Sequence, residues 1–153
     1  HRDLHSFPTR RSSDLLVRAA ALNPASGAAH RKLGECLLAL GNVDRAAAAF
    51  GNAVKRNPND AAALSQLGLL FHRKGENPEI ALLFCRHSIE IAPRNGALRR
   101  NLGSLCLGLN RPEEALAAFE RAQELGCDSR ADIDRVREAL TPPEEASPKK
   151  ETA

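Results

Sequence analysis

The thiol and imidazole side chains are the groups in this chain that could bind a metal ion or act as nucleophiles. A zinc or redox site needs closely paired thiols, usually as CxxC, and the sequence has no such pair. Three of the four cysteines occupy positions where an apolar side chain is expected, so we interpret them as small core residues. They are separated by 49, 21 and 21 residues, at Cys36, Cys85, Cys106 and Cys127.

The histidines give no catalytic pattern either. His30, His72 and His87 lack the spacing of metal ligands, and the sequence has no nucleophile elbow and no phosphate-binding loop. The first four residues, HRDL, match the start of a kinase catalytic loop, but position 8 is Pro where that loop has Asn. We therefore expect a non-enzymatic protein without catalytic residues, cofactor or metal, with the histidines on solvent-facing helix positions.

Composition is that of a soluble globular protein of one domain. The 153 residues are 42% hydrophobic and 27% charged. Only 3% are aromatic, so stacking platforms for single-stranded nucleic acid are absent. The net charge of +3 comes from interspersed signs rather than from a clustered basic face. No apolar run approaches the about 18 to 20 residues of a membrane span. We expect neither nucleic-acid binding nor a membrane span.

One segment, residues 31–60, recurs along the chain and fixes its organisation. Ten residues separate each proline that ends a copy from the glycine inside the next copy. The recurring positions are Leu33, Gly34, Ala46, Phe50 and Pro58, then Leu67, Gly68, Ala81, Cys85 and Pro93, then Leu102, Gly103, Ala115 and Phe119.

Each copy predicts two amphipathic helices. In the first copy they cover residues 28–40 and about 44–56, with Gly41 as a left-handed cap between them. The glycines Gly34, Gly68 and Gly103 fall inside helices, where glycine costs about 1 kcal/mol relative to alanine. We expect each to let the partner helix approach closely, against the alanine that opens the second helix.

The spacing L-G-x2-Φ, then A-x3-F, then P, at a period of about 34 residues, resembles the tetratricopeptide repeat. The resemblance implies an all-α fold: an α-solenoid of stacked antiparallel helix pairs with a C-terminal capping helix. The expected divisions are the second helix of a truncated repeat over 16–26, repeats over 27–60, 61–95 and 96–128, and a capping helix over 129–140. The middle repeat has one extra residue, which we place in the turn before Pro78.

The two ends depart from the repeats. Residues 1–15 share nothing with them, and residues 6–15, SFPTRRSSDL, resemble a translated sequencing adapter, so we expect a disordered artefact joined to a fragment. Ser129 and Asp132 approximate a capping box at the start of the last helix, whose apolar stripe is Ile133, Val136 and Leu140. Residues 141–153 have no apolar periodicity, and we expect a disordered tail.

The resemblance further implies that the first helix of each repeat lines a concave face that binds a peptide or helix of a partner protein. Five of the outward positions are basic or potentially basic and one is acidic, which predicts a groove preferring an acidic segment or a free C-terminal carboxylate. The alternative is a set of solvated helix faces. The candidate positions are Arg31, Lys32, Glu35, Ser65, Gln66, Leu69, His72, Arg73, Arg100, Asn101 and Ser104.

Chaperone-binding members of this family hold a terminal carboxylate with a clamp of Lys, Asn, Asn, Lys and Arg. Arg31 and Asn101 fit that clamp loosely, whereas Glu35 and Ala97 stand where Asn and Lys are needed, so the sequence does not match the complete clamp.

Two classes of function stay open: a bacterial-style interaction scaffold, or the C-terminal accessory or regulatory array of a larger enzyme or regulator whose upstream domain is missing. An N-terminal face exposing Leu15, Leu16 and Leu22 would also allow self-association. The absence of a disulfide pattern favours the cytoplasm. The periplasm stays open, because a signal peptide would be lost with the natural N-terminus.

Overall fold

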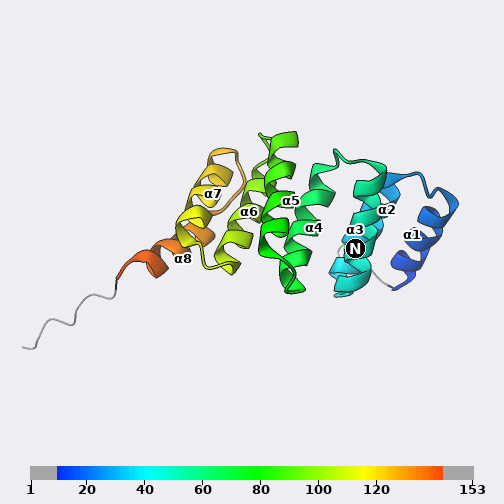
Figure 1. Ribbon diagram of the computed structural model, residues 1–153, viewed down its shortest axis with the longest axis horizontal. Helices are drawn as coiled ribbons and strands as arrows, with labels where there is room; N and C mark the ends of the chain where they lie inside the picture. The colour runs from blue at the N-terminus through cyan, green and yellow to red at the C-terminus, as the bar shows by residue number, and fades with distance from the viewer. Residues whose placement is uncertain (1–9, 143–153) are drawn as a thin grey trace, which may run out of the picture.

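The computed structural model describes residues 10–142, and within that range it consists of eight helices and no strand (Figure 1). The helices follow one another in a row from α1 at one end to α8 at the other. The predicted all-α solenoid is confirmed. The bounds are α1 Arg10–Leu22, α2 Gly27–Ala39, α3 Val43–Arg56, α4 Ala61–Arg73, α5 Pro78–Ile91, α6 Gly96–Gly108, α7 Pro112–Glu124 and α8 Arg130–Leu140.

Helices α2 and α3, α4 and α5, and α6 and α7 form the three pairs with the most extensive packing. Each pair then contacts the next through its second helix, as α3 does with α4 and α5 with α6. Helices α4 and α6 also contact each other, whereas the described parts of α3, α5 and α7 make no comparable contacts among themselves. The repeat register aligns α2 with α4 and α6, so the first helices form the inner layer of the array and the second helices form the outer layer.

The turns inside the pairs use a left-handed residue, as predicted for Gly41. Gly41 has φ +78° and Gly75 has φ +72°, and Gly126, which lies between α7 and α8, has φ +84°. In the third pair Asn110 takes the same role at φ +58°, since asparagine tolerates this conformation better than most residues. Next to each of these residues, a backbone N–H reaches back to the last turn of the helix, as from Asn42 to the Leu37 carbonyl at 2.9 Å.

The glycines inside the first helices lie where the paired helices approach most closely. A Cβ atom on Gly34 would lie 3.0 Å from the Phe50 ring, and one on Gly103 would lie 2.7 Å from the Phe119 ring. Only at Gly68 does the opposing atom belong to the predicted alanine, the Ala81 carbonyl oxygen at 2.7 Å. In the first and third repeats a phenylalanine ring occupies the space opposite the glycine. In the middle repeat the smaller Cys85 stands at that position, so the backbone of α5 comes as close to the glycine as the side chain does.

Helix α1 begins at Arg10, six residues earlier than the predicted half-repeat helix. The predicted unstructured segment therefore extends too far toward Leu15. Ser13 lies two helical turns before Ala20, and both side chains are buried on one face of α1, which extends the packed face toward the N-terminus. The rest of that prediction, residues 1–9, and most of the predicted tail, residues 143–153, lie outside the described residues.

The predicted capping box at the start of α8 is wrong. Ser129 is the N-cap residue of α8 but makes no side-chain cap bond, and its hydroxyl donates instead to the Cys127 carbonyl at 3.1 Å. The Ser129 N–H donates to Gln123 Oε1 at 2.8 Å, so it is not available to a carboxylate of α8. Asp132 binds arginines instead. The apolar stripe is correct, with Ile133 and Val136 buried.

Candidate functional site

The inner face carries an aligned grid of side chains from α2, α4 and α6. On each helix, residues four and seven positions apart point to the same side. The grid contains most of the predicted groove positions. Its members are Arg31, Glu35 and Leu38 on α2, Ser65, Leu69 and His72 on α4, and Arg100, Ser104 and Leu107 on α6.

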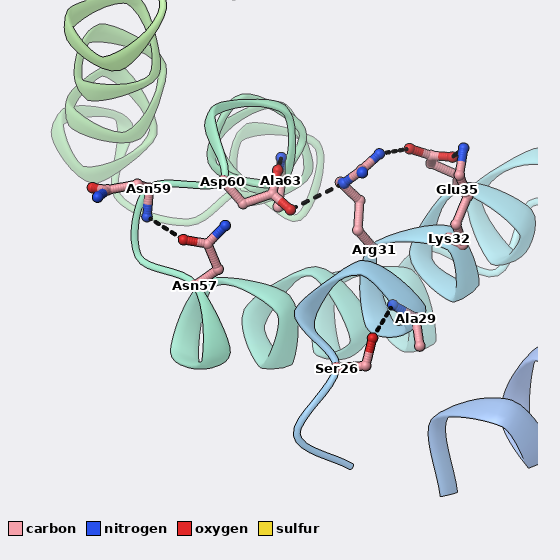
Figure 2. Close-up of polar contacts among 9 residues, drawn as sticks. All are labelled: Ser26, Ala29, Arg31, Lys32, Glu35, Asn57, Asn59, Asp60 and Ala63. Carbon is pink, nitrogen blue, oxygen red and sulfur yellow. Dashed lines mark hydrogen bonds and ion pairs between the residues drawn. The ribbon is translucent and has the colours of Figure 1, made fainter. Parts of the chain in front are cut away.

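Three polar contacts join successive first helices along the N-terminal end of this grid. Arg31 Nε donates to Asp60 Oδ2 at 3.0 Å, which links α2 to the start of α4 (Figure 2). Asn101 Nδ2 of α6 donates to Ser65 Oγ of α4 at 2.9 Å. Arg100 Nε donates to Asp132 Oδ2 of α8 at 2.8 Å. These contacts hold the first helices side by side.

Asp60 combines two roles at the start of α4. Its Oδ1 accepts the Ala63 N–H at 3.0 Å as an N-cap, while its Oδ2 accepts from Arg31 (Figure 2). The same register position is Ser26 in α2 and Asn95 in α6, and both also cap their helices. The N-cap position predicts the capping role, but no local sequence pattern connects Asp60 with Arg31.

Most of the predicted basic positions on this face are bound to carboxylates. Arg31 also pairs with Glu35 at 3.0 Å, and Glu35 binds Lys32 at the same distance. Burial lowers the pKa of Arg31, but the nearby Asp60 and Glu35 carboxylates outweigh it and the net shift is upward. Of the five predicted basic positions, His72 and Arg73 have no carboxylate partner within the described chain.

Beyond its N-terminal row the grid carries three leucines, with Leu38 and Leu107 in the C-terminal row beside His72, and Leu69 in the middle row. Leu38, Leu69 and Leu107 are half-buried and pack against the hydrophobic core, which leaves part of each side chain at the surface. His72 lies over α6, because a Cβ atom on Gly108 would be 2.5 Å from its Nε2. Ser65 is fully buried, so it supports the helices and does not face a ligand. Gln66 is half-exposed and Ser104 exposed.

The described residues contain no group of three or more His, Cys, Asp or Glu side chains that could hold a metal ion. Cys36, Cys85 and Cys106 are buried, Cys127 is half-buried, and all four are unbridged thiols. Between residues 10 and 142, none of the helices has the length and apolar character needed to cross a membrane.

We expect the buried thiols to be unreactive in the folded protein. Burial, with a smaller contribution from Cys106, raises the pKa of Cys85 to about 12 from an ordinary value of 9.0. At pH 8 the folded chain should react with iodoacetamide at Cys127 first, because only the thiolate is a good nucleophile and this thiol is the most exposed. Mass spectrometry after timed labelling checks this, with all four sites labelled in guanidinium as the control.

Rapid labelling of Cys85 in the native protein would contradict this burial.

The raised pKa of Cys85 also makes stability depend on pH, since the unfolded chain loses the Cys85 proton at lower pH than the folded chain does. The contribution of the protonated Cys85 to the free energy of unfolding is fully present below about pH 9 and is lost as the pH rises toward 12.

A family model described as tetratricopeptide repeat matches residues 9–50, 37–88 and 86–132. A "TPR repeat-containing protein" of Treponema pallidum (strain Nichols) is 34% identical over 82 residues, which are 54% of this chain. Those residues are 10% of that protein, so the chain spans about a tenth of its length.

Two solved structures have a similar fold. The first TPR of Spaghetti (RPAP3) bound to an HSP90 peptide has a TM-score of 0.68 and 16% identity, covering 75% of this chain and 93% of that one. MamA has a TM-score of 0.64 and 24% identity, covering 79% and 70%. The family model covers residues 9–132 with overlapping matches and the fold agrees, so the chain belongs to the tetratricopeptide repeat family.

Proposed function

We propose that this chain is a protein-interaction scaffold that binds a peptide or helix of a partner protein on the inner face of α2, α4 and α6. The observation that carries the proposal is the aligned grid on these three helices, which the polar contacts hold in register. A preformed surface reduces the entropy cost of binding an extended segment. The Spaghetti structure contains a bound HSP90 peptide, which supports peptide binding as a use of this fold.

The two ends of the grid favour different roles. Arg31 and Arg100 are occupied by carboxylates, so their charge is largely compensated before any ligand arrives. We propose that a partner segment contacts the half-exposed leucines Leu38, Leu69 and Leu107 with apolar side chains. An acidic group of the same segment, such as a side-chain or C-terminal carboxylate, would bind near Arg73, which is exposed and has no carboxylate partner in the described chain.

Site-specific photo-crosslinking tests this assignment. We expect a benzoylphenylalanine at Ser104, exposed on the inner face, to form adducts with a partner protein in the source cell, and one at Ala117, exposed on α7, to form none. Arg73→Glu should reduce the Ser104 adduct several-fold, because reversing one exposed charge changes a binding energy by about 1 kcal/mol or more. Arg94→Glu, at another exposed arginine that has no carboxylate partner among the described residues, is the matched control. Equal adducts from both crosslinker positions would contradict the inner-face site.

A second candidate function is that of an accessory array in a longer protein. It is supported by the Treponema relative, in which the matched residues are a tenth of the length. Sequencing the genomic region upstream of the codon for Arg10 tests it. A continuous reading frame that encodes a catalytic domain would support it, and an in-frame start codon close to α1 would count against it.

A further inference from the structure

Three grooves separate consecutive second helices on the outer side of the array; one is filled by aromatic side chains and one is bridged by ion pairs. In the groove between α3 and α5, Phe71 of α4 packs edge-to-face against Phe84 of α5, with ring centroids 5.4 Å apart and an interplanar angle of 77°. Both rings pack against the core cluster that contains Phe50. This groove is therefore filled by the protein's own aromatic side chains.

The groove between α5 and α7 is closed by ion pairs. Arg86 Nη2 lies 3.4 Å from Glu114 Oε2, and Arg111 Nη2 lies 3.1 Å from Glu79 Oε1. These pairs cross from one second helix to the next. Cys106 is buried near these pairs, and its pKa is raised mainly by burial and also influenced by Glu114, Arg86 and Arg111.

The remaining groove, between α1 and α3, is open. The repeat register places Leu37 and Ala49 where the next groove has Phe71 and Phe84, and both residues line a cavity of about 400 Å³. The cavity wall is mostly apolar, with Val17 and Ala20 of α1 and Leu33 of α2. The side chains of this groove are too small to fill the space that the aromatic pair occupies one repeat further along.

Within the part of the chain that the structure describes, no ion pair involves the polar side chains that line this groove. Arg45 lines the cavity at the position that Glu114 has in the α5–α7 groove, and Val17 stands where Arg86 would cross to meet it. Within residues 10–142 no carboxylate binds Arg45. A neighbouring hollow of about 370 Å³ shares Pro24, His30 and Asn52 with the cavity, and Lys55 and Arg56 line it.

The charge around the cavity has one dominant sign. Arg45 lines the cavity and Lys55 and Arg56 line the neighbouring hollow, whereas no Asp or Glu lines either. The α1–α3 cavity therefore lacks the bulky apolar side chain that fills the α3–α5 groove and the carboxylate that binds arginine in the α5–α7 groove. A ligand with an apolar side chain and a carboxylate would supply both groups.

We propose that the α1–α3 cavity is a second docking site, for an acidic segment of a partner protein that inserts a phenylalanine or leucine side chain and places a carboxylate against Arg45. The inserted side chain occupies the space that Phe84 fills in the next groove. The site is separate from the inner face, because the lining residues of α2, such as Leu33 and Leu37, lie on a different side of that helix from Arg31 and Glu35.

The probe is a fluorescein-labelled peptide of sequence DEDFEDD, titrated with the 153-residue chain and followed by fluorescence anisotropy. We expect saturable binding that weakens about tenfold or more when the peptide phenylalanine is replaced by alanine, because burying such a side chain contributes about 1.5 to 3 kcal/mol. Ala49→Phe, which fills the cavity as Phe84 does, and Arg45→Glu should each weaken binding to a similar degree.

One arginine variant controls for non-specific attraction. Arg94→Glu removes an exposed basic charge outside both proposed sites, and we expect it to change the affinity less than threefold. Circular dichroism establishes that Ala49→Phe folds; if it does not, Ala48→Phe narrows the cavity from an exposed position. Absence of saturable binding, unchanged affinity in the filled-cavity variant, or equal losses in Arg45→Glu and Arg94→Glu would overturn the proposal.

Discussion

Replacing Gly68 by leucine is expected to lower the free energy of unfolding by about 3 kcal/mol, since overpacking of a tight helix contact commonly costs about 1 to 3 kcal/mol. A Cβ atom at this position would lie 2.7 Å from the Ala81 carbonyl oxygen and 2.8 Å from Cys85 Sγ. A backbone oxygen cannot rotate away as a flexible side chain can. Helix α5 would have to move away from α4, in the central pair of the array.

Urea unfolding followed by circular dichroism at 222 nm measures this effect. The matched control is Gly51→Ala in α3, because a Cβ atom there meets nothing within 4 Å. Alanine is the better helix former, so this variant should be more stable by up to about 1 kcal/mol. If the free energy of unfolding of Gly68→Leu lies within about 0.5 kcal/mol of that of the unmodified chain, α4 and α5 do not pack as closely as the distances at Gly68 indicate.

The helices could be predicted from the sequence because each repeat contains its own start and stop signals. The predicted helix over residues 28–40 is observed as Gly27–Ala39, and the one over 44–56 as Val43–Arg56. Gly41 ends the first of these, and Asn42 caps the second. These signals act over a few residues and do not depend on how the repeats stack.

The electrostatic character of the inner face could not be predicted in the same way. Arg31 and Asp60 are 29 residues apart, and Arg100 and Asp132 are 32 residues apart. Whether such residues meet depends on the rotation between neighbouring repeats, which a helix face considered alone does not contain. The sequence therefore predicts the basic positions without the carboxylates that compensate them. Among the predicted groove positions, Leu69, His72 and Arg73 are the ones that we expect to contact a partner.

The open groove has a sequence signal that becomes useful only with the structure. Aligning the repeats puts Ala49, Phe84 and Ala118 in one column, but Ala118 is buried under a closed groove and Ala49 beside an open one. The difference comes from Arg86 and Glu114, which cross the later groove. A small residue at this repeat position therefore predicts a cavity only where the neighbouring repeat positions also lack side chains that cross the groove.

Phe119→Ala is expected to destabilise the fold by about 3 to 5 kcal/mol, the usual cost of removing a buried phenylalanine. Phe119 is fully buried in the core cluster that joins α5, α6, α7 and α8. Loss of the ring would weaken the contacts that hold the capping helix on the last repeat. Urea unfolding measures the loss, and Leu83→Ala, at an exposed position of α5, should change stability by less than about 1 kcal/mol.

A double-mutant cycle tests whether the Phe119 ring is the reason that position 103 must be glycine. A Cβ atom on Gly103 would lie 2.7 Å from the Phe119 ring, so Gly103→Ala should destabilise the unmodified chain by about 1 to 3 kcal/mol. In the Phe119→Ala background the ring is gone, and the same change should be neutral or stabilising by up to about 1 kcal/mol, because alanine favours the helix. The glycine would then be required by the phenylalanine rather than by the helix. Effects of Gly103→Ala that agree within about 0.5 kcal/mol in the two backgrounds would show that the ring and the glycine are independent.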